Sequence, residues 1–222
     1  MEQENREKKS NSLIDENRVI NFSDAVFAFA ATLLVLKIDL PALTAPEATS
    51  PRLVAELINL WPSYFANIIS FLMIGYYWLT HHAIFSMVKR MDGKIIWINT
   101  IFLIFLSFLP FPVDLFGDYN QSEIIIIFYS LSLAITGFLL CLIWAYAVKA
   151  KTIDPSLTKK QITFFSLRFL IAPIVFTLSV ALAYLDPSVS KISWIFVIVG
   201  TILVDKFFKL RIAGPFSKEF ES

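Results

Sequence analysis

Long runs of apolar residues, separated by short polar segments, recur along the whole chain. Six of them approach the roughly 20 residues that a helix needs to cross about 30 Å of hydrocarbon at 1.5 Å per residue. They lie near Val19–Leu40, Leu57–Thr80, Ile95–Leu115, Ile124–Val148, Phe164–Tyr184 and Ile192–Leu210. The runs lack the alternation of barrel strands, and a backbone in lipid must satisfy its own hydrogen bonds. The pattern therefore predicts an all-α membrane protein with six transmembrane helices.

Composition agrees with this picture, because 57% of the 222 residues are hydrophobic and only 17% are charged. The net charge of +1 offers no basic field for nucleic acid. The single cysteine excludes an intrachain disulfide and a cysteine metal cluster. We expect one six-helix domain over residues 1–222, with short cytosolic tails at 1–17 and 211–222 and no cofactor.

Lysine and arginine are distributed unequally among the polar segments. If the six runs alternate in direction, sixteen of these bases fall on one side, and three, Lys37, Arg52 and Lys191, fall on the other. The positive-inside rule assigns the richer side to the cytosol. We therefore expect both termini to be cytosolic in a multi-pass protein of the plasma membrane.

The first run, RVINFSDAVFAFAATLLVLKIDLP, has an apolar stripe along one face when it is drawn as a helix of about 100° per residue. The members of the stripe are Phe22, Ala25, Val26, Phe29, Thr32, Leu33 and Leu36. Such a stripe is typical of lipid contact or ordinary helix packing in membrane bundles. It would also suit the wall of a pore in a symmetric oligomer.

Ser23 and Asp24 lie to the side of this stripe. A charged side chain in the bilayer costs about 2.5 to 3.5 kcal/mol even on the mildest scales, so the carboxylate needs a partner or a function. Trp78 and His81, three residues apart, share a face near the expected cytosolic end of the second run, and Asn99 lies early in the third. The pattern favours a buried hydrogen-bond cluster between helices, and the alternative is a proton relay or an ion ligand.

A catalytic or metal site explains the same residues poorly. Ser23, His81 and Asp24 are the residue types of a nucleophilic triad, but the sequence has no GxSxG elbow and no evident oxyanion hole beside Ser23. His81 and His82 are adjacent and point in different directions, which disfavours a metal site. We predict neither enzyme activity nor a bound metal.

The motif R-x-x-x-F-S-D at Arg18, Phe22, Ser23 and Asp24, followed by ATLLVLKI, resembles the signature of the endosomal and lysosomal transmembrane potassium channel family in its prokaryotic form. The stretches FLMIGYYWLTHHAIF, with its W-x-x-H, and IIWINTIFLIFLSFLPFP resemble the family's second and third helices. The resemblance is strong over about half of the chain.

This resemblance implies a potassium-selective cation channel in which the first helix lines the pore and no TVGYG filter is used. With one six-helix repeat per chain, it implies a homotetramer in the lipid bilayer with K⁺ as the permeant ion. The pore constriction that it implies is formed by Phe29, Leu33 and Leu36, and the other pore-lining positions are Thr32, Phe22, Ala25 and Val26. The interhelical polar network that it implies consists of Arg18, Ser23, Asp24, Trp78, His81 and Asn99. Conduction is then passive, and the cost of dehydration at a hydrophobic constriction favours potassium over sodium.

The alternative from another class is a proton-coupled secondary transporter or proton pathway that uses Asp24 and His81 as titrating groups. The sequence shows no inverted repeat and no matching pair of Gly/Pro-broken helices, which are typical of such transporters. We therefore prefer the channel.

Overall fold

The computed structural model describes residues 16–38 and 49–208, and the expectations about the two tails fall largely outside these ranges. The described residues are almost entirely helical, and a single bridge, between Val88 and Ile153, is the one β pairing among them. The elements in chain order are α2 (Glu16–Leu33), η1 (Val35–Lys37), α3 (Ser50–Asn59), α4 (Trp61–Met87), α5 (Gly93–Phe108), α6 (Pro110–Asp118), α7 (Glu123–Lys149), α8 (Lys159–Ala183), α9 (Pro187–Ser193) and α10 (Phe196–Phe208).

Five segments are long and apolar enough to cross a membrane, which makes this a multi-pass membrane protein. They are Trp61–Met87, Gly93–Asp118, Glu123–Lys149, Lys159–Ala183 and Pro187–Phe208. They correspond to the second through sixth predicted runs. The first predicted run is not among these five segments. Its helix, α2, is 18 residues long and includes three charged residues, Glu16, Arg18 and Asp24.

Two of the predicted runs are divided at prolines. The third run is broken at Leu109, where α5 ends and α6 begins with Pro110 in its first turn. Proline has no backbone N–H and suits the first turn of a helix, where that N–H would have no partner. The second run begins later than predicted, because α3 ends at Asn59 and α4 starts afresh at Trp61.

The first run also differs from its prediction as one continuous helix over Val19–Leu40. The α-helix ends at Leu33, and the backbone tightens into the 3₁₀ turn of η1, closed by a bond from Ile38 N to Val35 O of 3.3 Å. At about 1.5 Å per residue the 18 residues of α2 span about 27 Å, close to the thickness of the hydrocarbon core.

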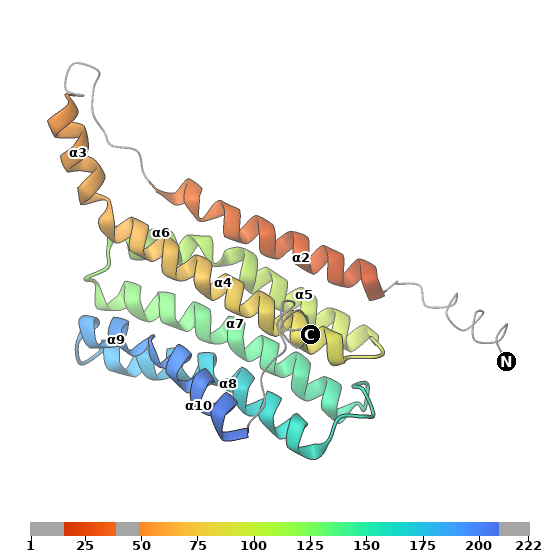
Figure 1. Cartoon of the computed structure of the whole chain (residues 1–222). Coiled ribbons are helices and arrows are strands. Elements are labelled where there is room, and N and C mark those ends of the chain that lie inside the picture. The colour runs from red at the N-terminus through yellow and green to blue at the C-terminus, as the bar shows by residue number, and fades with distance from the viewer. Residues whose placement is uncertain (1–15, 39–48, 209–222) are drawn as a thin grey trace, which may run out of the picture.

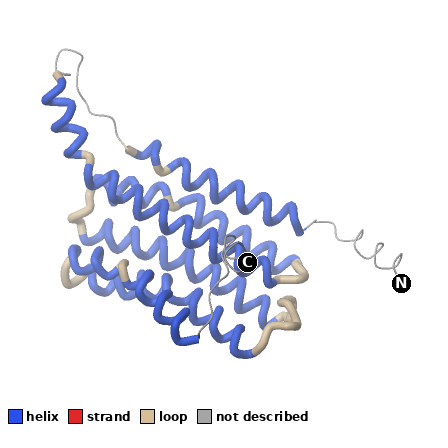
Figure 2. The backbone as a smooth tube through the Cα atoms, viewed as in Figure 1, coloured by secondary structure: helices blue, strands red, loops and turns tan. Residues whose placement is uncertain are grey.

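The helices pack side by side around α7, as Figures 1 and 2 show. On one side of α7 lie α4, α5 and α6, with α2 outermost against α4 and α5. On the other side lie α8, α9 and α10. The contact between α7 and α8 is close at Gly137, where an added Cβ would come within 3.1 Å of Pro173 Cδ.

Buried polar side chains join the helices of the second half. Between α8 and α9, Ser179 Oγ lies 2.7 Å from Ser190 Oγ and accepts a bond of 2.7 Å from Trp194 Nε1. Between α8 and α10, Arg168 Nε lies 2.9 Å from Asp205 Oδ1 in a largely buried ion pair. Interhelical hydrogen bonds of this kind help membrane helices to associate, since lipid supplies no hydrophobic drive between them.

One end of the bundle is tied together by its loops. Lys89 N donates to Thr152 O and Asp154 N donates to Met87 O, both at 2.8 Å, which joins the α4–α5 loop to the α7–α8 loop. The start of α2 belongs to the same end, because the Glu16 carboxylate accepts from the backbone N–H of the α4–α5 loop. Exposed bases gather here, namely Lys89, Arg90, Lys94, Lys149, Lys151, Lys159 and Lys160. The grouping matches the charge pattern of the sequence, and the assignment of this end to the cytosol stays a prediction.

Candidate functional site at the first helix

The inner face of α2 packs on α4 and α5. Its buried residues are Ser23, Phe27 and Ala30, and Leu34 continues the same face just beyond the helix. The spacing of three and four residues places these side chains on one stripe, as expected for a helix with one packed face. This packing holds α2 against the bundle along its whole described length.

A chain of hydrogen bonds crosses this face and joins three side chains that are each at most 1% exposed. Asn99 Nδ2 on α5 donates to Ser23 Oγ on α2 at 2.9 Å, and Ser23 Oγ in turn donates to Val19 O at 2.9 Å. Asn99 Oδ1 lies 3.0 Å from His81 Nε2 on α4. Because a carbonyl oxygen only accepts, His81 donates through Nε2.

The His81 ring is enclosed by three phenyl rings. The ring centroids of Phe27, Phe85 and Phe102 lie 5.3, 4.4 and 5.7 Å from that of His81. His82, the next residue, is exposed and its ring lies 6.0 Å from Trp78 instead. The two histidines therefore have separate surroundings, as their adjacency in the sequence predicts.

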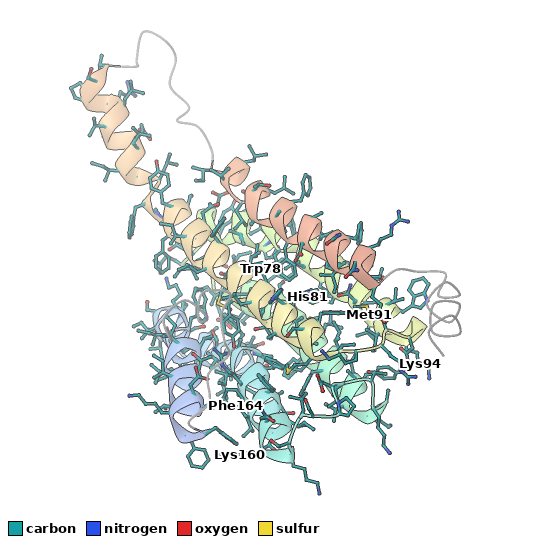
Figure 3. All side chains as sticks on the ribbon, turned by 45° about the vertical axis from the view of Figure 1, so that its right-hand side comes forward. Trp78, His81, Met91, Lys94, Lys160 and Phe164 are labelled. Carbon is teal, nitrogen blue, oxygen red and sulfur yellow. The ribbon has the colours of Figure 1, made fainter. Side chains whose placement is uncertain are left out.

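Asp24 belongs to a second polar contact on the flank of α2. Trp78 Nε1 donates to Asp24 Oδ1 at 2.9 Å, and both side chains are partly exposed. Figure 3 shows Trp78 and His81 together on α4, on the side of the bundle where α2 lies. Arg18 is exposed and has no hydrogen bond to the other five residues of the predicted network. The structure thus brings together Ser23, Asn99 and His81 in one group and Asp24 and Trp78 in another.

The outer face of α2 carries the predicted stripe and is left open by the rest of the described chain. Phe22, Phe29 and Leu36 are 62%, 63% and 75% exposed. Of the other members, Ala25 and Thr32 are exposed, and Val26 and Leu33 are partly buried. Leu36 lies on η1, so its place on the stripe does not follow from α-helical geometry as the sequence analysis supposed.

Two acidic contacts beside the site were missed in the sequence analysis. Glu16 Oε1 accepts from Met91 N at 3.0 Å, which ties the start of α2 to the α4–α5 loop. Asp92 caps α5 by accepting from Ile95 N, and it also accepts from Tyr146 OH at 2.6 Å. The hydrogen bond from Tyr146 holds the pKa of Asp92 below its usual value. An acid directly before G-K-I-I was a visible N-cap signal, whereas the contact of Glu16 had none.

No group of three His, Cys, Asp or Glu side chains within residues 16–38 and 49–208 is placed to hold a metal ion. The site therefore consists of a helix with a packed, hydrogen-bonded face and an open apolar face.

These features define a multi-pass helical membrane protein, and comparisons with known proteins supply the family. The model of the endosomal/lysosomal potassium channel TMEM175 family matches residues 18–110, which include the R-x-x-x-F-S-D motif. A potassium channel of Streptomyces collinus is 31% identical over 177 residues, which cover 78% of this chain and 84% of that protein. The chain belongs to the TMEM175 family, as the motif predicted, and this is a family of channels and not of enzymes.

A solved structure and an animal relative extend the comparison. The crystal structure of a lysosomal potassium-selective channel TMEM175 homologue from Chamaesiphon minutus matches with a TM-score of 0.69 and 29% identity, over 90% of this chain and 98% of that one. The human endosomal/lysosomal proton channel TMEM175 is 35% identical over 101 residues, or 44% of this chain and 20% of that protein. Members of the family are thus named for potassium and for protons.

Proposed function

We propose that this protein is a potassium-selective cation channel of the plasma membrane, in which four copies of the chain surround a pore lined by the outer face of α2. The observation that carries the proposal is the exposure of Phe22, Phe29 and Leu36 on a helix whose opposite face is fully packed. An apolar face that the rest of the described chain leaves open suits contact with a symmetry axis. The bacterial relatives named as potassium channels support the choice of ion.

The narrowest part of the proposed pore is a ring of Phe29 side chains, followed by Leu33 and Leu36. An apolar ring offers no ligands, so an ion must lose water to pass, and potassium holds its water less strongly than sodium. Thr32 is the polar neighbour of this ring. Its hydroxyl donates to Phe29 O at 2.9 Å, which leaves the lone pairs of the hydroxyl oxygen free to face a cation.

The polar contacts on the inner face have a supporting role in this proposal. The bond of Ser23 to Asn99 and that of Asp24 to Trp78 connect α2 to two different helices. They fix the rotation of α2 about its axis, and so decide which side chains reach the pore. K⁺ is the permeant ion in this scheme, and no cofactor takes part.

The test is current through bilayers that contain the purified protein under a potassium gradient. We expect a reversal potential near that of potassium, and an increased sodium current in Phe29→Ala because a wider ring demands less dehydration. Phe138→Ala, which removes a partly exposed phenyl group on α7, is the matched control and leaves selectivity unchanged. A reversal potential that does not distinguish K⁺ from Na⁺ would refute the proposal, and an unaltered Phe29→Ala channel would remove Phe29 from the pore.

Proton conduction is the second candidate, favoured by the name of the animal relatives. The described structure gives no hydrogen bond between Asp24 and His81, and the phenyl rings around His81 separate it from water. A proton path in this protein would therefore depend on Asp24 and not on His81. Proton uptake by liposomes that lack potassium tests this, and equal uptake by Asp24→Asn and the unaltered protein would exclude Asp24 from such a path.

A further inference from the structure

A groove of about 430 Å³ runs between α2 and α4 beside the polar contact of Asp24 with Trp78. Small residues open it, since Ala28 and Ala31 line it from α2 and Gly75 lines it from α4. A Cβ added at Gly75 would meet no atom within 4 Å. The groove is thus a space that this sequence leaves empty between two helices that are otherwise packed.

Asp24 is the charged residue that lines the groove, and only one of its two carboxylate oxygens has a hydrogen bond to a described residue. Its Oδ1 accepts from Trp78, whereas its Oδ2 has no hydrogen bond or ion pair with any described residue. The whole of α4, from Trp61 to Met87, contains no lysine or arginine that could neutralise it. A carboxylate at membrane depth is stabilised by a cation or by water, so the free oxygen favours a positively charged occupant.

The walls of the groove indicate what kind of cation fits. Phe71 and Trp78 are 56% and 36% exposed, and both present aromatic surface to it. Aromatic faces attract cations, most strongly that of tryptophan. The indole is held in place by its bond to Asp24 and by the ring of His82, 6.0 Å away. A hydrated metal ion gains nothing from such apolar walls, whereas an ammonium group on an apolar body can use both the carboxylate and the walls.

We propose that this groove binds a small organic ammonium cation with an aromatic or short aliphatic body. The ammonium group donates to Asp24 Oδ2 and lies against the Trp78 indole, while the apolar body fills the space above Gly75 and beside Phe71. The volume suits a ligand of this size. Because Asp24 is on α2 and Trp78 is on α4, the occupant bridges the two helices and restrains α2, which gives the channel a site for regulation by amines.

The test measures binding directly and does not depend on whether the protein conducts. The full chain is placed in phosphatidylcholine nanodiscs, and binding of 4-fluorophenethylammonium is followed by fluorine NMR. The uncharged 4-fluorophenethyl alcohol is the probe control. We expect saturable binding of the amine, at least tenfold tighter than that of the alcohol.

Variants identify the groove as the site. Asp24→Asn keeps an oxygen for the Trp78 N–H, so the fold is retained, but it removes the charge and is expected to weaken amine binding about tenfold, or about 1.4 kcal/mol. Gly75→Leu fills the groove and is expected to abolish binding. Asp186→Asn, a matched change at the exposed N-cap of α9, leaves binding unchanged.

Equal affinities for the amine and the alcohol, or for Asp24→Asn and the unaltered protein, overturn the proposal. A lack of saturable binding also overturns the proposal, whether the groove binds nothing or is covered by a second copy of the chain. If binding of the amine disappears when phosphatidylethanolamine replaces phosphatidylcholine, the groove belongs to a lipid headgroup. This outcome also overturns the proposal. A protein that binds the amine but carries no potassium current contradicts only the proposed function.

Discussion

Asn99 is the residue through which α5 holds both α2 and α4, and its removal provides a quantitative test of the buried polar group. Asn99→Ala deletes the 2.9 Å bond to Ser23 and the 3.0 Å bond to His81. Interhelical bonds in membranes average about 0.6 kcal/mol each. Ser23 keeps its bond to Val19 O, but His81 loses the partner of Nε2 among phenyl rings, and an unpaired buried donor costs about 1 to 3 kcal/mol. Together these effects predict a loss of about 2 to 4 kcal/mol in the free energy of unfolding.

The assay is denaturant unfolding in mixed micelles, with Asn67→Ala as the matched control. Asn67 donates only to Ser63 O one turn away, and its Oδ1 is buried without a partner among the described residues. Removing an unsatisfied acceptor recovers part of what it cost, so we expect a change of less than about 1 kcal/mol. Equal losses in the two variants would show that the bonds of Asn99 contribute nothing specific, and the reasoning would be refuted.

Three further predictions concern other contacts and use the same measurement. Asp205→Asn weakens the largely buried ion pair with Arg168, and we expect a loss of about 1 to 3 kcal/mol, less when both residues are replaced by leucine. Gly137→Val forces a side chain against the neighbouring helix and is expected to cost about 1 to 3 kcal/mol. The pKa of Asp154 is lowered by hydrogen bonds from Ser156, so its carboxylate stabilises the folded loop above the ordinary value of 3.8 and loses this effect as the pH falls through the lowered pKa. The difference in stability between the unaltered protein and Asp154→Asn should therefore shrink below about pH 4, and a constant difference would contradict this.

Hydrophobicity alone was enough to predict the five segments that are long and apolar enough to cross a membrane. The second to sixth runs were predicted because apolar residues dominate them whatever they contact. The residues at which the helices begin and end were less predictable, since they depend on contacts with other helices. The second run was predicted to stop at Thr80, but α4 continues to Met87 because His81, polar in the sequence, is satisfied by a residue of another helix. The short helix α3 was missed because its polar residues resemble those of a loop.

The sequence analysis placed Trp78 and His81 on one face and expected one polar cluster, whereas the structure has two groups, a division that helix geometry allows. Ser23 and Asp24 are adjacent and so point about 100° apart, and Trp78 and His81, three residues apart, differ by about 60°. Two directions on each helix allow two separate contacts, and the structure has one toward Asn99 and one between Asp24 and Trp78. The sequence could not show which residues pair, because that depends on how far apart α2, α4 and α5 lie.

The contacts on the inner face of α2 fix the rotation of the helix and so determine which residues lie on its outer face. A rotation of α2 that moved Phe29 toward the core would carry Ser23 and Asp24 away from their partners. The buried Asn99 Nδ2 would lose its acceptor at a cost of about 1 to 3 kcal/mol, and the partly exposed Trp78 would lose its bond to Asp24. Apolar packing alone is a weak constraint on rotation in a membrane, since lipid and protein interior are similarly apolar. The hydrogen bonds therefore determine which apolar side chains α2 presents on its open face. It follows that loss of a polar contact on the inner face should alter a property of the outer face, even though no residue of the outer face has been changed.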